Sequence, residues 1–395
     1  MHTLLVRNVR LAPTWPNTAA VDVLCRDGLI ALVSAGISDP HDEVIDGNGE
    51  ILIAAFSDVH AHLDSTRLGL PFRPHTADRT LESLIENDRS NWRSAEMSVT
   101  DRATYTLGRT IAAGATRVRS HAQVDPQSGL DRLEGVLAAR EAHRDRAIVE
   151  IVAFPQAGIL REQGTPELLD EAMAMGADLV GGLDPEGYDG NADGHLDVVF
   201  AIAAKHHAGV DIHLHDRGEI GVATIENICR RALTLDARVN ISHCFGLVTA
   251  DADTTKRLVE TLAVSGVTVT TVAPGTTPPM PLRHLEEAGV AIGLGQDGTR
   301  DYWSPYGNGD MLDRTWQLAF TNGFRKDADI EHCLEVATAG GAKIMGIDNV
   351  GLEIGSAADL VVVPGDTVTA AVMDRALRSF VIRAGRVVAR GGELV

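Results

Sequence analysis

Two histidines at alternate positions, His60 and His62, end a run of apolar residues that reads as a β-strand. Because alternate side chains of a strand face the same side, the two imidazoles should point in one direction. At this spacing they can bind a single divalent metal ion. The pair alone is weak support for a metal site. His206 and His207 also lie together, in a segment whose helical periodicity predicts that they face solvent.

Two more strand-like segments end in residues that could complete a ligand set. His213 ends the fifth such segment in the middle of the chain, and Asp297 follows the eighth. Three imidazoles and one carboxylate suit Zn²⁺ or Fe²⁺ and leave a coordination position open for water. Water bound in this way has a pKa of about 7, so hydroxide is available as a nucleophile at neutral pH. Asp297 could bind the metal and also accept the proton of the nucleophile.

Residues capable of metal binding or proton transfer follow every strand-like segment except the seventh. Besides those named above, they include His121, Gln156, Asp184, His215, Asp216 and His243. Strand ends that merely meet solvent would favour lysine, serine, asparagine and glutamate over histidine. We expect His121 to contact a substrate. We expect His243 to orient the nucleophile or to stabilise developing negative charge, the alternative being an ordinary core histidine. Trp303 could stack on a flat ring.

The elements that would position these residues alternate regularly. Eight apolar strand-like segments cover residues 51–59, 116–121, 149–154, 178–183, 210–213, 239–243, 267–272 and 291–295. The segments between them, such as 100–113, 165–175 and 253–265, have the 3.6-residue apolar spacing of helices. Eight such units with near-continuous apolar strands predict a (β/α)8 TIM barrel of the α/β class. Barrel enzymes place their chemistry at the carboxyl ends of the strands, where the residues above lie.

Both ends of the chain differ from its middle. Short strand-like segments separated by glycine and aspartate turns cover residues 3–9, 21–26, 29–34, 43–46, 359–363, 380–384 and 386–389. We predict one small β-sandwich built from residues 1–54 and 346–395, with the barrel at residues 55–345.

The composition limits the partners of the chain. Of the 395 residues, 44% are hydrophobic and 23% charged, and the formal charge is −20, which argues against nucleic acid and anionic membranes as partners. We find no run of about 18 apolar residues and no signal-peptide pattern. The four cysteines form no CxxC pair. We therefore expect a cytoplasmic homo-oligomer that acts on a small molecule, without nucleic-acid or membrane partners.

Several motifs resemble the amidohydrolase superfamily, and within it the cytosine deaminase branch. They are VHAHLD at 59–64, IVAFPQAGIL at 151–160, GADLVG at 176–181, LGQD at 294–297 with WSPYG at 303–307, and DLVVV at 359–363. The resemblance implies a metal site formed by His60, His62, His213 and Asp297. It further implies that His243 polarises the nucleophile and that Gln156 hydrogen-bonds to a ring amide of the substrate. No lysine ends the fourth strand, where binuclear relatives carry a carbamylated bridge, so one metal ion is expected.

Three positions depart from the cytosine deaminase pattern. Asp216 stands where these enzymes have a glutamate that shuttles a proton to the leaving amine, and His215 precedes it. Gly298 stands where they have a second acidic residue. The His-Leu-His sequence that ends in His215, together with Asp184, resembles instead the triazine-pathway hydrolases that remove isopropylamine from N-isopropylammelide. His215 would then share the proton shuttling and contact the substrate, or it would orient Asp184 or Asp216.

We predict a hydrolase that removes an amine or ammonia from a flat nitrogen heterocycle of the cytosine, triazine or pterin kind. Metal-activated hydroxide would attack the ring carbon, and His215, Asp216 or both would deliver a proton to the leaving nitrogen. Gln156 and Asp184 would hold the ring. A hydrolase that opens a cyclic amide or imide is the alternative among enzymes, and a non-catalytic metal-binding protein is the alternative outside them.

Two other motifs are set aside. GLGQDG at 293–298 fits the G-x-G-x-x-G pattern, but it closes the last predicted strand instead of opening an early βαβ unit. Cys244 follows His243, which would suit a Cys–His nucleophile, but we expect the thiol to face the core.

Overall fold

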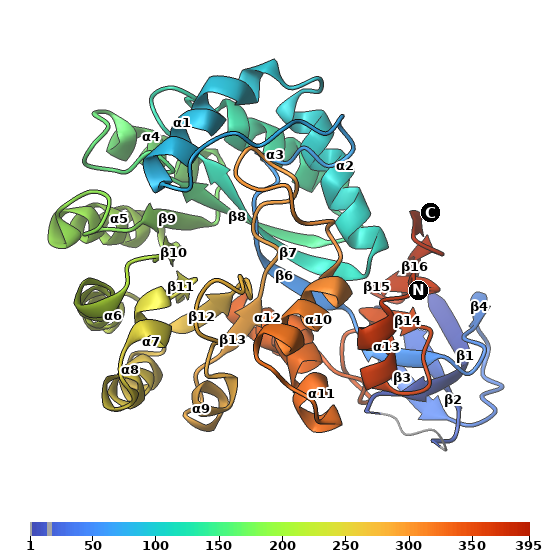
Figure 1. The fold of residues 1–395 in the computed structure, drawn as a ribbon. Helices are drawn as coiled ribbons and strands as arrows, with labels where there is room; N and C mark the ends of the chain where they lie inside the picture. The colour runs from blue at the N-terminus through green and yellow to red at the C-terminus, as the bar shows by residue number, and fades with distance from the viewer. Residues whose placement is uncertain (1, 14–17) are drawn as a thin grey trace.

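The chain forms a barrel of parallel strands and a sheet built from both of its ends (Figure 1). The structure, a computed structural model, describes residues 2–13 and 18–395. The first strands (blue) and the last strands (red) lie together on one side of the barrel in Figure 1. The two ends of the chain therefore fold next to each other, outside the barrel that the middle of the chain forms.

The barrel has eight parallel strands that neighbour one another in chain order. They are β6 (Phe56–Ala61), β7 (Ala115–Gln123), β8 (Ile148–Phe154), β9 (Leu179–Leu183), β10 (Gly209–His213), β11 (Val239–Ser242), β12 (Thr268–Thr271) and β13 (Ile292–Leu294). A hydrogen bond of 2.7 Å from Asp297 N to His60 O brings the end of β13 beside β6. The predicted (β/α)8 barrel is confirmed.

Helices follow the barrel strands and cover their outer faces (Figure 1). They are α1 (Leu81–Asn91), η1 (Trp92–Ser94), α2 (Val99–Ala112), α3 (Asp131–Ala142), α4 (Thr165–Met175), α5 (Ala192–His206), α6 (Gly218–Ala232), α7 (Phe245–Thr249), α8 (Ala252–Ser265), α9 (Leu282–Glu287), α10 (Met311–Thr321), α11 (Asp327–Glu335), η2 (Val336–Gly340) and α12 (Gly341–Ile344). Local sequence sets their ends. The side chains of Ser98 and Asp251 accept hydrogen bonds from the first amides of α2 and α8, and Gly266 ends α8 in the left-handed conformation.

The second sheet joins strands from both ends of the chain. These are β1 (Thr3–Leu11), β2 (Val21–Arg26), β3 (Leu29–Ser34), β4 (Glu43–Asp46), β5 (Ile51–Ala54), β14 (Leu360–Val363), β15 (Phe380–Arg383), β16 (Arg386–Arg390) and β17 (Glu393–Leu394). The order is β17-β16-β15-β14-β5-β1-β2-β3, and β4 pairs with β1. A separate sheet built from both termini is confirmed, while the domain boundaries stay a prediction. Neither β17 nor helix α13 (Val368–Asp374) was predicted.

One predicted strand, at residues 51–59, is two strands. It divides at Ala55 into β5, which pairs with β14 of the terminal sheet, and β6, which begins the barrel. The apolar run shows no break because both strands are buried. Buried Arg117 on β7 holds this junction. It donates to Ala55 O and Ser57 Oγ and pairs with Asp359 at 3.1 Å. The terminal sheet is thereby joined to the start of the strand that carries the histidine pair.

No described helix combines the length and the apolar character needed to cross a membrane. All four cysteines are buried and free of disulfides. Burial raises the pKa of the Cys244 thiol, which fits a core thiol and not a nucleophile. The cytoplasmic location and the homo-oligomer stay predictions.

Candidate active site

Five histidines gather at the carboxyl ends of barrel strands, with His60 among the others. The ring centre of His60 lies 5.3 Å from that of His62, 4.3 Å from His121, 4.5 Å from His213 and 4.8 Å from His243. His60, His121 and His213 lie on β6, β7 and β10, and the other two histidines follow the ends of β6 and β11. Closure of the barrel therefore brings together residues that lie up to 183 positions apart in the chain.

The ring nitrogens of three of these histidines, together with Asp297, fit a metal site. Asp297 Oδ1 lies 3.6 Å from His60 Nε2 and 3.4 Å from His62 Nε2. His62 Nε2 lies 3.3 Å from His213 Nε2. A tetrahedral ion with bonds of about 2.0–2.1 Å keeps its ligands roughly 3.3–3.4 Å apart. His60 Nε2 is buried and has no hydrogen-bond partner among residues 2–13 and 18–395, and a bound cation would supply one.

The tautomer of His60 follows from its neighbours. Ser242 Oγ donates to the Asp211 carboxylate at 2.7 Å, so its hydrogen is already used. His60 Nδ1, 2.9 Å from Ser242 Oγ, must then be the donor of that contact. A neutral ring with its proton on Nδ1 has a lone pair on Nε2, the nitrogen that faces the other ligands. Such an outer contact orients a metal-binding histidine.

The surroundings favour the protonation states that bind a cation. Burial lowers the pKa of His60 and His213, so these rings are neutral. Burial alone would raise the pKa of Asp297, but the adjacent His60 and His62 hold it well below its usual value. His62 differs, because the Asp297 carboxylate outweighs burial and raises its pKa. A cation at the site would oppose that protonation.

His121 lies behind the ligands and not at the surface of the cavity. Its side chain is fully buried against the rings of His60 and His213, and burial lowers its pKa to about 3. The predicted contact with a substrate therefore does not match its place. Its Nε2 lies 3.8 Å from Asp211 Oδ1, and one of its ring nitrogens lies within 4.8 Å of ring nitrogens of His60, His62 and His213. The ring is positioned to support His60 rather than to meet a ligand in the cavity.

A cavity of about 990 Å³ opens above these residues. Its floor includes the predicted ligands His62, His213 and Asp297 together with His243 and His215. Its wall includes the predicted substrate-binding residues Gln156 and Trp303. Trp303 packs on the apolar cluster formed by Ile85, Phe154 and Leu183. The side of its ring that is not packed there is available to a flat molecule.

His215 faces the cavity and is paired with Asp184. Its Nδ1 donates to Asp184 Oδ2 at 2.9 Å, and its ring centre lies 4.3 Å from that of His243. Burial works against protonation, but the carboxylates of Asp184, Asp297 and Asp216 outweigh it and raise the pKa of His215. A histidine that is held by a carboxylate and inclined to carry a proton is suited to general acid catalysis.

Asp184 and Asp216, unlike His215, do not line the cavity. Asp184 is buried and does not line the cavity. Its Oδ1 accepts the backbone amides of His215 and Asp216, so it holds His215 and is not placed to hold a ring. Asp216 also lies outside the cavity lining, and its Oδ2 accepts from Gly187 N at 2.9 Å. Of the two candidate proton shuttles, only His215 faces the cavity.

Several of these residues have an unusual backbone. Asp184, His243 and Asp297 have φ angles of 34°, 66° and 64°, in the left-handed region that residues other than glycine seldom adopt. Asp184 and His243 directly follow the last residues of β9 and β11, and Asp297 lies three residues after the end of β13. Strained backbone of this kind concentrates at functional sites, where the surrounding structure holds it in place.

One cavity residue that was not predicted is Asp301. It is buried, and burial raises the pKa of its carboxyl group to about 7. Its Oδ1 accepts hydrogen bonds of 2.8 Å from Trp303 N and Ser304 N. The available signal was an acidic residue two positions before the predicted Trp303, in the polar segment that follows the last barrel strand.

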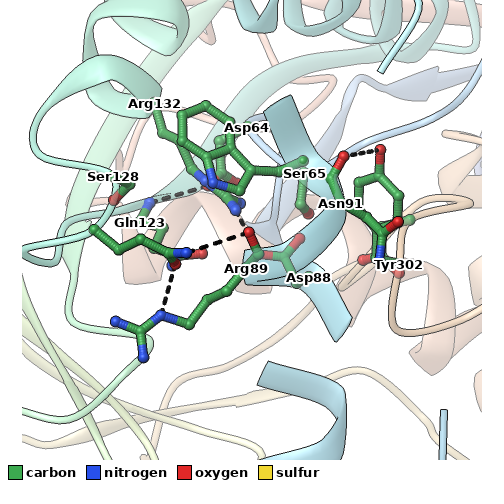
Figure 2. A network of polar contacts seen from close by, with 12 residues as sticks. Asp64, Ser65, Asp88, Arg89, Asn91, Gln123, Ser128, Arg132 and Tyr302 are labelled. Carbon is green, nitrogen blue, oxygen red and sulfur yellow. Dashed lines mark hydrogen bonds and ion pairs between the residues drawn. The ribbon is translucent and has the colours of Figure 1, made fainter. Parts of the chain in front are cut away.

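Polar contacts hold the wall of the cavity to the barrel (Figure 2). Arg132 on α3 pairs with Asp88 on α1 and, at 3.4 Å, with Asp64, and all three side chains are buried. Two residues of α1 in turn fix Tyr302, the neighbour of Asp301. Asn87 Nδ2 donates to Tyr302 O at 2.7 Å, and Tyr302 Oη donates to the carbonyl of Asn91 at 3.0 Å. The wall is thus set by ion pairs and side-chain hydrogen bonds.

Comparison with known proteins agrees with this arrangement. The sequence profile of the amidohydrolase family matches residues 43–389. The chain belongs to the amidohydrolase family. It is 37% identical to an N-isopropylammelide isopropylaminohydrolase of Burkholderia multivorans, and the two structures superpose with a TM-score of 0.93 over 100% of both chains. It is 29% identical to the N-isopropylammelide isopropyl amidohydrolase of Pseudomonas sp. (strain ADP), over 99% of this chain and 98% of that one.

A third relative lies further away. The structure of Klebsiella pneumoniae 5-methylcytosine deaminase with 5-fluorocytosine is 25% identical, with a TM-score of 0.82 over 98% of this chain and 97% of that one. The resemblance to the cytosine deaminase branch is therefore confirmed. These relatives are amidohydrolases and deaminases, so this amidohydrolase is an enzyme that hydrolyses C–N bonds.

Proposed function

We propose that this amidohydrolase removes an alkylamine or ammonia from a flat nitrogen heterocycle of the triazine or pyrimidine kind. The observation that carries the proposal is the pairing of His215 with Asp184 at the floor of the cavity, beside a cluster that fits a metal ion. The departure of an amine requires a proton donor beside the leaving nitrogen, whereas the attack of water on the ring carbon does not require one. The relatives named for N-isopropylammelide and 5-methylcytosine support the same class of substrate.

One divalent ion, Zn²⁺ or Fe²⁺, held by His60, His62, His213 and Asp297 would activate a water molecule for attack on the ring carbon. Asp297 would accept the proton that this water loses, because its Oδ1 lies within 3.6 Å of His60 Nε2 and 3.4 Å of His62 Nε2. His243 lines the cavity with a neutral ring, since burial keeps its pKa well below the usual value. It would orient the attacking oxygen by a hydrogen bond.

His215 would deliver a proton to the leaving nitrogen. With Nδ1 bonded to Asp184, its Nε2 is the nitrogen that a substrate in the cavity can meet. The C–O bond forms at the ring carbon, the C–N bond breaks, and the amine leaves with the added proton. Asp184 acts through His215, and Asp216, which points elsewhere, has no part in this step.

The wall would hold the ring. Gln156 offers an amide that can pair with a ring amide, and the free face of Trp303 suits stacking. The cavity of about 990 Å³ stands at the upper end of the range for drug-sized ligands, about 300–1,000 Å³. A single ring would leave much of it empty, which favours an amine that carries an alkyl substituent.

The test is a panel of heterocycles offered to the purified enzyme after its metal content is measured. We expect about one divalent ion per chain, and release of amine from N-alkylated aminotriazines faster than release of ammonia from cytosine or a pterin. A ring-opened acid from a cyclic imide, with no free amine from any substrate, would instead establish a cyclic amide hydrolase. Absence of turnover by the metal-loaded protein would favour a non-catalytic metal-binding role.

A further inference from the structure

Asp301 occupies the space that a side chain at position 298 would fill. A Cβ atom placed on Gly298 would lie 1.9 Å from Asp301 Oδ2 and 2.7 Å from its Cγ. Real atoms do not approach so closely, so a side chain at position 298 would displace the carboxyl group. The φ of Gly298 lies outside the left-handed region, so close approach, not backbone conformation, is what requires glycine here.

The two oxygens of Asp301 differ in their contacts. Oδ1 is held by the amides of Trp303 and Ser304, which fix the direction of the carboxyl group. Among the residues that the structure describes, none donates a hydrogen bond to Oδ2, and no arginine or lysine pairs with it. Gly298 and Asp301 both line the cavity, and Oδ2 is the oxygen of Asp301 that lies beside Gly298.

A carboxyl group so deeply buried normally has its oxygens satisfied. Asp301 is 3% exposed, yet one of its oxygens is left for whatever enters the cavity. Asp301 follows β13, and β13 lies next to β6, the strand that leads to His60 and His62, because Asp297 N donates to His60 O. Gln156 follows β8, which is the third strand from β13 when the barrel is followed through β6 and β7. The two groups can therefore meet a flat ring at different edges.

We infer that Asp301 is a specificity-determining residue whose Oδ2 accepts a hydrogen bond from an N–H group of the heterocycle. Gly298 makes this possible because it has no side chain in the space that the Asp301 carboxyl group occupies. The acidic group beside Asp297 is thereby supplied from position 301 instead of position 298. The preferred substrate has an N–H donor on the edge near the carbon that is attacked, and the same ring methylated at that nitrogen is disfavoured. The inference rests on the proposed function.

Asp301→Asn separates recognition from a structural role. Asparagine keeps an oxygen for the amides of residues 303 and 304, but it places an NH₂ group where Oδ2 now accepts. We expect kcat/KM for the N–H substrate to fall by about 30- to 100-fold, mainly through KM, because the buried N–H group of the substrate is left without an acceptor. Turnover of the N-methylated analogue should change less than about threefold.

The matched control is Asp313→Asn. Asp313 also lines the cavity, but its carboxylate already pairs with Arg375 at 3.3 Å. This variant should affect the N–H substrate and the methylated analogue by the same factor.

Gly298→Ala tests the shared space by an independent route. In the wild-type chain the added methyl group must displace the carboxyl group, so the N–H substrate should suffer a loss similar to that of Asp301→Asn. In an Asp301→Ala background the methyl group has room, and its further effect should be less than about threefold because the two changes are coupled. Additive losses in this double-mutant cycle would overturn the shared position.

The two proposals fail in different ways. A metal-loaded wild-type enzyme that releases no amine from any ring overturns the proposed function and this inference with it. An active wild type whose Asp301→Asn variant loses the N–H and the N-methyl substrates equally overturns this inference alone. Metal content and the thermal unfolding midpoint are measured for each variant, so that a folding defect is recognised as such.

Discussion

The floor of the cavity includes the strand-end residues His62, His213 and Asp297, whereas much of its wall comes from the loops that follow β6 and β13. The floor residues take their directions from the alternation of parallel strands and from closure of the barrel. The wall has no such periodicity, and buried polar contacts such as Arg132 with Asp88 hold it in place. In the proposed function, the floor would activate the water, and the wall would select the molecule that reaches it.

The most severe change to the floor is the removal of a ligand. His213→Ala should lower kcat/KM on the order of ten-thousandfold and abolish metal binding, since three donors hold the ion less tightly and the activated water is lost. Metal analysis and amine release measure the two effects. His207→Asn is the control, because His207 is exposed and asparagine tolerates its left-handed φ of 51°. A His213→Ala variant with intact turnover would contradict the metal site.

His215 lies where the floor meets the wall, so its substitution tests the boundary between the two. His215→Asn should lower kcat on the order of a thousandfold while the metal stays bound, because the leaving nitrogen loses its proton donor. Substrates with a better leaving group should recover part of this loss. Asp216→Asn is the matched control and should change kcat less than about threefold, since its carboxylate bonds Gly187 outside the cavity. The reverse order of effects would make Asp216 the proton shuttle.

The same contrast explains what could be predicted from the sequence. The period of a strand and the rule that barrels act at their carboxyl ends were enough to bring His60, His62, His213 and Asp297 together. The strand at 51–59 was misjudged because hydrophobicity alone does not show that a buried run changes sheets at Ala55. The number of barrel strands could still be predicted, because each of the eight strands lies in a separate apolar run.

The wall could not be predicted in this way. Asp301 meets Gly298 through a turn in a loop, and no periodic pattern encodes that contact. The sequence also did not place Asp184 behind His215 or His121 behind His60. A polar residue at a strand end faces the cavity or lies behind it according to its own backbone angles, and Asp184 has a φ of 34° that strand alternation does not anticipate.

The ion pairs that hold the wall offer a test of its separate construction. Arg132→Met leaves the carboxylates of Asp64 and Asp88 buried without their partner, and should destabilise the protein by about 3 kcal/mol. Denaturant unfolding measures this loss. Arg140→Met is the control, because the Arg140 pair with Asp178 is more exposed and contributes less than about 1 kcal/mol. Where Arg132→Met still folds, KM should rise and metal content stay unchanged. A variant that loses bound metal as well as substrate affinity would show that the floor and the wall depend on the same contacts.

The smallest effect is expected beneath the floor, at Ser242. Its hydroxyl accepts from His60 Nδ1 and donates to Asp211, which fixes the His60 tautomer without touching the metal position. Ser242→Ala should weaken metal affinity by about 10- to 100-fold, because the Nδ1–H loses its acceptor and the ring its fixed orientation. Competition with a chelator measures the affinity. At saturating metal, kcat should return to within about threefold of the wild type, since the four ligands remain. Ser265→Ala is the control, because the Ser265 hydroxyl caps backbone carbonyls on α8. Unchanged metal affinity in Ser242→Ala would show that neighbouring rings alone orient His60.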